Sequence, residues 1–218
     1  MLLVIKFGIK GSLRFLSHAE TMAVFQRACI RAGINIQYSQ GFNPRPRLSL
    51  PLPRPVGVES DDELLALRVV RDPNELPAES CQSRIGTDLF AQLPDGFELV
   101  SVSIAGAGTS FQPCSARYIL PVGAECVNEE LRMTIGRLLA SENLYIRRQT
   151  PGKRSRSRNV DVRVFLESLE LDGQDIIVEC IINSDGSIRV DEILELLGLN
   201  QGNLAGPIRR TNVQWQSH

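Results

Sequence analysis

The segment Leu2-Leu3-Val4-Ile5-Lys6-Phe7-Gly8, followed by Ser17-His18-Ala19-Glu20, decides the fold class of this chain. The first stretch is a short apolar run, which is typical of a buried strand. The second has the S-x-x-E spacing of a capping box, in which Ser and Glu satisfy free N–H groups at the start of a helix. Apolar side chains then recur on one side of the predicted helix, at Met22, Phe25, Cys29 and Ala32. Gly33 ends that helix, so a strand and a helix open the fold.

The rest of the chain continues to alternate between strand and helix patterns. In the first half we predict strands at 35–38, 63–70 and 97–104 and a helix at 74–88. In the second half we predict strands at 116–122, 144–149, 164–171, 176–183 and 208–215 and helices at 127–141 and 190–198. Asp172-Gly173 lies between two β-rich runs and fits a hairpin turn.

These elements predict an α+β protein made of two tandem ferredoxin-like β-α-β-β-α-β units with antiparallel sheets. The N-terminal domain covers residues 1–106 and the C-terminal domain covers residues 113–218. The chain has 218 residues, of which 43% are hydrophobic, so each domain can bury a core of its own. The apolar run at 2–8 is too short for a signal peptide, and we expect a cytoplasmic protein.

Charge is segregated along the chain, although the total is close to zero at -1. Residues 1–58 hold eight Lys or Arg against Glu20, a net charge of +7. Residues 59–112 hold three basic and ten acidic side chains, a net charge of -7. Residues 143–163 hold seven basic side chains against Asp161, a net charge of +6. Such separated blocks create local positive potential, so we expect an anionic partner, either RNA or an acidic protein face.

The stretch Tyr38-Ser39-Gln40-Gly41-Phe42-Asn43-Pro44-Arg45-Pro46-Arg47 has the composition of a binding loop. Its Gly and two Pro keep the backbone out of regular structure, which limits the entropy lost when a ligand binds. Arg45 and Arg47 present planar donor groups that suit phosphate or carboxylate. Tyr38 and Phe42 offer ring faces for stacking. The alternative is a solvated turn.

His18 is the first residue of the predicted helix and lies close in sequence to Arg14. Free N–H groups and the positive end of the helix dipole favour an anion there. His18 is therefore a candidate phosphate donor or general base, and an exposed histidine without such a role is the alternative. Ser17 and Glu20 fit helix caps better than catalytic groups. We expect His18 and Arg14 to share one concave surface with the loop 38–47.

Two further basic features extend this candidate interface. Arg27 and Arg31 stand four residues apart on the helix, a like-charged pair that a phosphate or an acidic face would relieve. The basic loop within 147–163 contains the run Pro-Gly-Lys-Arg-Ser-Arg-Ser-Arg, which cannot pack a core. Such loops order on polyanions, and a solvated linker is the alternative.

Other classes of chemistry lack their usual sequence signals. The five Cys are scattered without a C-x-x-C pair, which argues against a disulfide framework, a zinc site or an Fe–S site. Cys29 and Cys180 are predicted to be packing residues, and Asp61-Asp62 to be surface charge. The motifs for nucleotide hydrolysis, dinucleotide binding, zinc proteolysis and serine hydrolysis are missing. We therefore predict no metal and no cofactor, and no run is long enough to span a membrane.

Several stretches within residues 5–70, and one further on, carry a resemblance to a known family: Lys10-Gly11-Ser12-Leu13-Arg14-Phe15-Leu16-Ser17-His18, Phe25-Gln26-Arg27-Ala28, Arg31-Ala32-Gly33, the loop 38–46, Pro51-Leu52-Pro53, Gly57-Val58-Glu59-Ser60 and Asn159-Val160-Asp161-Val162-Arg163. Through these stretches the chain closely resembles the radical-SAM-linked protein family. The resemblance implies a partner, since this domain is encoded beside or fused behind a radical SAM Fe–S protein in that family. The cluster motif C-x-x-x-C-x-x-C is missing, so this chain is the accompanying module. Where the family has a His in an N-P-H-P loop this chain has Arg45, so a role of that His does not carry over.

We therefore predict a non-catalytic RNA-binding or substrate-presenting partner of a radical SAM enzyme, in tRNA or rRNA modification or ribosome-related metabolism. One alternative is a metal-independent endoribonuclease that uses His18, supported by a looser resemblance to tandem ferredoxin-like CRISPR repeat-RNA endoribonucleases. The other is a protein-binding adaptor that docks through its acidic stretches. The candidate nucleic-acid-binding residues are the basic, aromatic and amide side chains of these segments: Arg14, His18, Arg27, Arg31, Tyr38, Gln40, Phe42, Asn43, Arg45, Arg47, Lys153, Arg154, Arg156 and Arg158.

Overall fold

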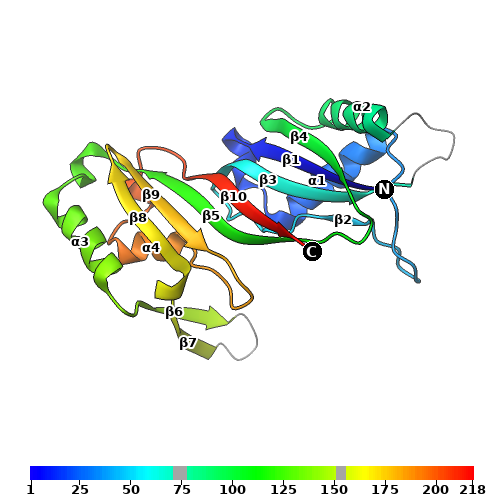
Figure 1. Ribbon diagram of the computed structural model, residues 1–218. Helices are drawn as coiled ribbons and strands as arrows, with labels where there is room; N and C mark the ends of the chain where they lie inside the picture. Colours follow the sequence, from blue (N-terminus) through cyan, green and yellow to red (C-terminus); the bar gives the residue numbers. More distant parts are fainter. Residues whose placement is uncertain (71–77, 151–155) are drawn as a thin grey trace. The chain divides into compact units, whose positions relative to one another are not determined.

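The computed structural model describes residues 1–70, 78–150 and 156–218, and it divides into two compact units (Figure 1). The N-terminal unit comprises Met1–Gln112 and Trp215–His218, and the C-terminal unit comprises Pro113–Gln214. Within the described residues the protein is a mixed α and β structure with four α-helices and mostly antiparallel strands. Residues 215–218, which the predicted limits assign to the second domain, belong to the N-terminal unit.

The N-terminal unit is built on a sheet with the strand order β4-β1-β3-β2. The central strand β1 (Leu2–Ile9) runs antiparallel to both β3 (Glu59–Arg68) and β4 (Phe97–Ala105). The short strand β2 (Leu48–Ser49) pairs with the other side of β3. Helix α1 (His18–Arg31) follows β1, and helix α2 (Ala78–Phe90) connects β3 to β4.

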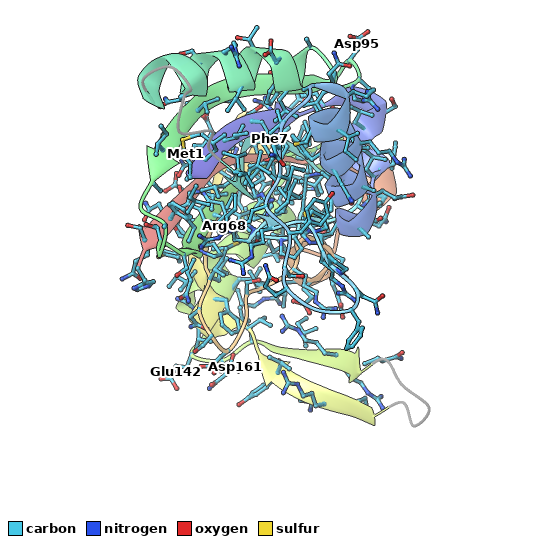
Figure 2. The ribbon with its side chains drawn as sticks, turned by 90° about the vertical axis from the view of Figure 1, so that its right-hand side faces the viewer. Met1, Phe7, Arg68, Asp95, Glu142 and Asp161 are labelled. Atoms are coloured by element: carbon cyan, nitrogen blue, oxygen red, sulfur yellow. The ribbon has the colours of Figure 1, made fainter. Side chains whose placement is uncertain are left out.

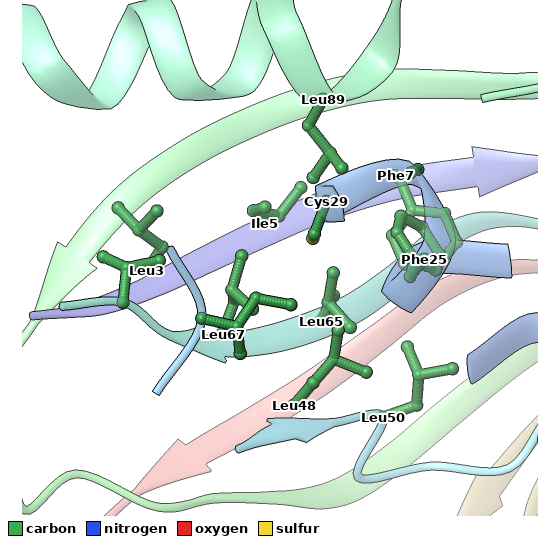
Figure 3. Packing of buried hydrophobic residues seen from close by; sticks show 13 residues of the cluster. Leu3, Ile5, Phe7, Phe25, Cys29, Leu48, Leu50, Leu65, Leu67 and Leu89 are labelled. Atoms are coloured by element: carbon green, nitrogen blue, oxygen red, sulfur yellow. The ribbon is translucent and has the colours of Figure 1, made fainter. Parts of the chain in front are cut away.

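The hydrophobic core of this unit lies between one face of the sheet and the two helices (Figure 3). Because side chains alternate along a strand, Leu3, Ile5 and Phe7 of β1 all point to this face. The rings of Phe7 and Phe25 meet edge to face, with 4.7 Å between their centroids. Burial of each large apolar side chain contributes about 1.5–3 kcal/mol, so this cluster fixes α1 against the sheet.

Helix α1 begins where the capping box predicts. The Ser17 Oγ accepts a hydrogen bond from the Glu20 N–H at 3.3 Å, and the Ser17 N–H donates to Glu20 Oε2 at 2.8 Å. The hydrogen bonds from Ser17 lower the pKa of the exposed Glu20 carboxyl. Gly33 follows the helix with a φ of 65°, a conformation that glycine adopts readily.

The C-terminal unit is built on a sheet with the strand order β10-β5-β9-β8. Strand β9 (Asp175–Ile181) runs antiparallel to both β5 (Phe111–Pro121) and β8 (Leu166–Asp172). Helix α3 (Glu129–Ala140) follows β5, and helix α4 (Val190–Leu196) precedes the last strand β10 (Arg209–Ser217). The predicted Asp172-Gly173 turn joins β8 to β9, with Gly173 at a φ of 59°.

A second, two-stranded sheet in this unit was only half predicted. Strand β6 (Tyr145–Thr150) matches the prediction at 144–149, and it pairs with β7 (Arg156–Asp161). Residues 156–161 were predicted to belong to a basic loop, because Arg and Ser alternate through residue 158. That prediction is wrong, because a two-stranded pair is held by backbone hydrogen bonds that composition does not show.

Two further predictions in the N-terminal unit need correction. Residues 35–38 form two isolated bridges, from Ile36 to Val69 and from Tyr38 to Pro46, instead of a regular strand. Strand β3 begins at Glu59, so the acidic run lies inside the sheet. Asp62 is buried and its Oδ1 lies 2.7 Å from the Lys6 Nζ on β1, which explains why it is not surface charge.

Candidate nucleic-acid interface

The predicted binding loop is a hydrogen-bonded hairpin formed by residues 37–47, which we call the tip hairpin. Its two sides are joined by hydrogen bonds from the Ser39 N–H to the Arg45 carbonyl at 2.8 Å and from the Arg47 N–H to the Gln37 carbonyl at 2.7 Å. The Arg45 N–H also donates to the Ser39 Oγ at 2.9 Å. Gly41 turns the chain at the end with a φ of 130°, a value that favours glycine.

The base of the tip hairpin is fixed to the end of β3. The Gln37 N–H donates to the Arg68 carbonyl at 2.8 Å, and the Arg68 N–H donates to the Arg47 carbonyl at 2.9 Å. Both sides of the hairpin therefore meet one residue of the sheet. Because this backbone is already ordered, ligand binding costs less conformational entropy than it would at a flexible loop.

The side chains of the tip hairpin are open to solvent. Phe42 is fully exposed, and Tyr38 is 41% exposed. Gln40, Asn43, Arg45 and Arg47 are exposed as well. Among the described residues, neither the Arg45 nor the Arg47 guanidinium has a hydrogen-bond or ion-pair partner. Their charges are therefore available to an external anion.

The pairing of the tip hairpin divides these side chains between two faces. Tyr38 lies opposite Pro46, whereas Ser39 is paired with Arg45. Because side chains alternate along a strand, Arg45 and Arg47 point to one face and Tyr38 points to the other. The loop therefore offers a cationic face and an aromatic face, with Phe42 at the end between them.

His18 and Arg14 lie near the start of α1, beside a very small hollow. His18, Arg54 and Glu63 line this hollow, whose volume of about 10 Å³ is enough for one water molecule. The Arg14 guanidinium stacks over the Phe15 ring at 4.4 Å and donates to the Gly11 carbonyl at 2.9 Å. None of the described residues that line this hollow comes from the tip hairpin, whereas Arg47 lines a different hollow. Of the residues expected on one concave surface, His18 lines the first of these two hollows and Arg47 lines the second, and the others line neither.

Arg54 is a structural residue that our sequence analysis did not identify. It is only 8% exposed, and its guanidinium donates to the Arg14 carbonyl at 2.6 Å and to the Leu16 carbonyl at 3.0 Å. It also donates to the carbonyls of Leu13, Pro55 and Val58. One side chain thus joins the turn before α1 to the turn at 55–58. The only signal in the sequence is a cation between prolines, in Pro53-Arg54-Pro55.

The helix arginines Arg27 and Arg31 are both exposed. The Arg31 Nη2 donates to the Gln92 carbonyl, which follows α2. Arg31 therefore also connects the two helices, while Arg27 remains a surface cation.

Two cations of the basic segment 147–163, Arg148 and Arg163, bind acceptors inside the C-terminal unit. The Arg148 Nε and Nη2 donate to Glu192 Oε1 and Oε2 at 2.6 and 2.7 Å, and the two side chains are only 11% and 5% exposed. The hydrogen bond to Glu192 raises the pKa of Arg148. Burial acts to raise the pKa of Glu192. Hydrogen bonds from the Arg148 side chain and the Arg189 N–H, together with the positive charges of both arginines, outweigh burial and hold the pKa of Glu192 below its ordinary value.

The Val160-Asp161-Val162-Arg163 segment forms the base of the β6–β7 hairpin (Figure 2). The Asp161 Oδ1 accepts hydrogen bonds from the N–H groups of Leu144 and Arg163 at 2.9 and 3.0 Å. The Arg163 guanidinium donates to the carbonyls of Leu139 and Ser141 at 3.1 and 3.0 Å, at the end of α3. Asp161 and Arg163 therefore join the base of the β6–β7 hairpin to the end of α3, which is a structural role.

Arg147 and Arg158 remain exposed on the β6–β7 hairpin, where Arg147 donates to the Ser157 Oγ at 2.9 Å. Arg147 pairs with Asn159, and Arg158 pairs with Arg148, so the two exposed cations point to opposite faces. Lys153, Arg154 and the Arg156 side chain lie outside the described residues.

The cysteines provide little chemistry. Cys29 and Cys180 are buried as predicted, and burial raises the pKa of each thiol to about 12. Among the described residues, no group of three or more His, Cys, Asp or Glu side chains could hold a metal ion. No helix in the described part of the chain is both long and apolar enough to cross a membrane.

The chain belongs to DUF2344, a family of uncharacterised proteins conserved in bacteria, whose sequence model matches residues 3–194. A search of curated proteins found no match.

Two solved structures show limited similarity. A chain of a Cbf5-Nop10-Gar1 complex aligns with 97% of this chain at 14% identity and a TM-score of 0.45. This chain spans 48% of that chain's length. An unknown protein from Galdieria sulphuraria aligns with 90% of this chain, and 86% of its own, at 11% identity and a TM-score of 0.22. At these TM-scores neither likeness carries an argument about function.

Proposed function

We propose that this protein is a non-catalytic RNA-binding module that presents RNA to a radical SAM Fe–S protein. The observation that carries the proposal is the tip hairpin, on which an exposed Phe42 lies beside two exposed arginines without partners among the described residues. An aromatic ring stacks on any base, and guanidinium groups bind phosphate without reading sequence. This combination suits unpaired RNA, because a base inside a duplex is already stacked.

The radical SAM partner rests on the resemblance of residues 5–70 to the radical-SAM-linked family. A module without a cluster motif or catalytic motif of its own needs an enzyme to act on the RNA that it holds. We accordingly place the protein in the cytoplasm, in tRNA or rRNA modification or ribosome-related metabolism.

The strand orders support the proposal of two ferredoxin-like units. In chain order, the first unit has β1, α1, β2, β3, α2 and β4, arranged in the sheet as β4-β1-β3-β2. The second has β5, α3, β8, β9, α4 and β10, arranged as β10-β5-β9-β8, with the β6–β7 hairpin inserted after α3. The same order of elements and the same order in the sheet occur twice, as in a β-α-β-β-α-β duplication.

The direct test is fluorescence anisotropy with labelled single-stranded and duplex RNA, over a range of salt concentrations. We expect the wild-type protein to bind the single strand, with affinity that falls as salt rises because counterions are released. An Arg45→Gln/Arg47→Gln double variant should bind weakly and with a shallower salt dependence. The matched control is Arg132→Gln, which neutralises an exposed cation on α3. No binding by the wild-type protein at low salt contradicts the proposal.

Two further measurements, RNA cleavage and a protein pull-down, test the two alternative functions. RNA cleavage that is lost in a His18→Ala variant supports the endoribonuclease. A pull-down with the radical SAM protein tests the adaptor, since charge reversal at Arg45 and Arg47 should weaken an adaptor complex. In the proposed module the protein complex survives that change and only RNA retention is lost.

A further inference from the structure

A second hollow of the N-terminal unit lies on the sheet face opposite the core. Leu48 and Leu67 pair across β2 and β3 and face the core, so the next pair, Ser49 and Ala66, faces the other side. Both side chains are small, and they leave room above the sheet. The resulting hollow has a volume of about 330 Å³. This lies at the lower end of the range of small-molecule pockets, about 300–1,000 Å³.

The wall of this hollow is the segment 109–111, which is held in place by hydrogen bonds. The Arg68 guanidinium donates to the Ala107 carbonyl, and the Thr109 N–H donates to the Gly106 carbonyl at 3.0 Å. Ser110 exchanges two backbone hydrogen bonds with His218, at 3.0 and 3.1 Å. The wall therefore keeps its position without a ligand.

The polar groups that line the hollow suit an anion. Arg47 and Arg68 supply two guanidinium groups, and Ser49, Thr109 and Ser110 supply three hydroxyl groups. None of the described residues that line it is acidic. Arginine donors match the oxygens of phosphate, and hydroxyl groups add further donors.

The remaining lining is apolar. Leu2 and Ala66 of the sheet and Phe111 of the wall all line the hollow. A ligand with a phosphate at one end and a flat or apolar body at the other satisfies both halves of this surface. A free inorganic phosphate uses only the polar half.

We propose that this hollow binds a phosphorylated organic ligand of the size of a mononucleotide, with the phosphate held by Arg47 and Arg68. Arg47 is shared with the tip hairpin, whereas Arg68 and the three hydroxyl groups belong to the hollow alone, so the site does not require RNA binding at the tip hairpin. The nucleotide can come from solution or be one unit of an RNA chain, because both present the same phosphate and base.

Isothermal titration calorimetry of the full chain tests the site with three probes: 5′-AMP, adenosine and inorganic phosphate. We expect 5′-AMP to bind about tenfold or more tightly than adenosine, because charge-assisted hydrogen bonds are lost without the phosphate. Inorganic phosphate should bind more weakly than 5′-AMP, since it leaves the apolar half empty. Competition between 5′-AMP and a short single-stranded RNA then distinguishes the two sources.

Two variants localise the binding. Ala66→Leu fills the hollow, and Thr109→Val removes one hydroxyl at nearly constant shape, so each should weaken 5′-AMP binding. Thermal melting checks that both variants fold. If Ala66→Leu does not fold, Thr109→Val still tests the site. Phe42→Ala is the control, because it lies at the end of the tip hairpin and should leave 5′-AMP binding unchanged.

The outcomes separate this site from the proposed function. If 5′-AMP binds but RNA does not, the hollow is supported and the RNA-binding proposal fails. If RNA binding depends on Phe42 and neither hollow variant alters 5′-AMP or RNA binding, the phosphate site is overturned and the RNA-binding proposal stands. Equal affinity for 5′-AMP and adenosine also overturns the site.

Discussion

In the tip hairpin, Arg45 and Arg47 are exposed and have no partner among the described residues, whereas in the β6–β7 hairpin the Arg148 side chain is only 11% exposed and is paired with Glu192. Both segments lie in the basic blocks of the sequence. They differ in what the fold places beside them, because α4 brings a carboxylate to β6. The charge of a segment therefore becomes surface potential only where the fold supplies no internal acid.

The largest effect on stability should come from breaking the ion pair between Arg148 and Glu192. We expect Arg148→Met to lower the free energy of unfolding by about 3–5 kcal/mol, because the buried Glu192 loses the cation that contacts both of its oxygens and keeps only the Arg189 N–H and the Arg189 guanidinium at 4.0 Å. Urea denaturation measures this change. Arg147→Met, on the next residue of β6, is the control and should change stability by less than about 0.5 kcal/mol. Equal effects of the two changes contradict the assignment of Arg148 as a structural cation.

The next effect concerns RNA and compares an aromatic residue on each hairpin. Phe42→Ala should weaken binding of single-stranded RNA by about 1–3 kcal/mol, the usual contribution of one stacked base. Tyr145, on β6, is 65% exposed and provides the matched change. Anisotropy measurements should show a smaller loss for Tyr145→Ala. A larger loss at Tyr145 moves the interface to the β6–β7 hairpin.

Acid should destabilise the β6–β7 hairpin through Glu192. Its pKa is lower in the folded protein than its ordinary value of 4.5, so its contribution is fully present above that value. The contribution is lost as pH falls through the lower, folded pKa. Urea titrations between pH 7 and pH 3 should therefore show a decline below about pH 4.5 that is smaller in Arg148→Met than in the wild-type protein. Identical pH profiles contradict this coupling.

The smallest effect should be on the stability of the tip hairpin. Arg45→Gln/Arg47→Gln should leave the free energy of unfolding within about 0.5 kcal/mol of the wild-type value, because exposed cations without partners contribute little. Thermal melting of this variant beside Arg148→Met gives the contrast directly. A large destabilisation means that these arginines have a structural role.

The sequence allowed the start of the fold to be predicted, because its signals are local. Ser17 and Glu20 are three residues apart and cap one helix end, and Asp172-Gly173 forms its turn within a few residues. The exposure of the aromatic and basic side chains of residues 38–47 was predicted for the same reason, since Gly and Pro are local signals for irregular backbone. The bonds between Ser39 and Arg45 were not predicted, because they depend on the conformation of the intervening residues.

The other differences come from partners that are distant in sequence. Asp62 is paired with Lys6 on the neighbouring strand, and Arg148 is paired with Glu192 on a later helix. Arg163 donates to carbonyls at the end of α3, which are more than twenty residues away. Counting charge along the chain cannot identify such pairs, so it overestimated the cations available to an RNA.

The side chain of Arg54 has a consequence for the order in which this chain can fold during synthesis. Its hydrogen bonds to the Arg14 and Leu16 carbonyls join residues that are 40 and 38 positions apart. The turn before α1 leaves the ribosome well before its partner does, and nascent chains grow at about 5–20 residues per second. The carbonyls of the turn before α1 therefore gain their hydrogen bonds from Arg54 only after that residue has emerged, whereas the local capping box of Ser17 and Glu20 is complete much earlier in synthesis.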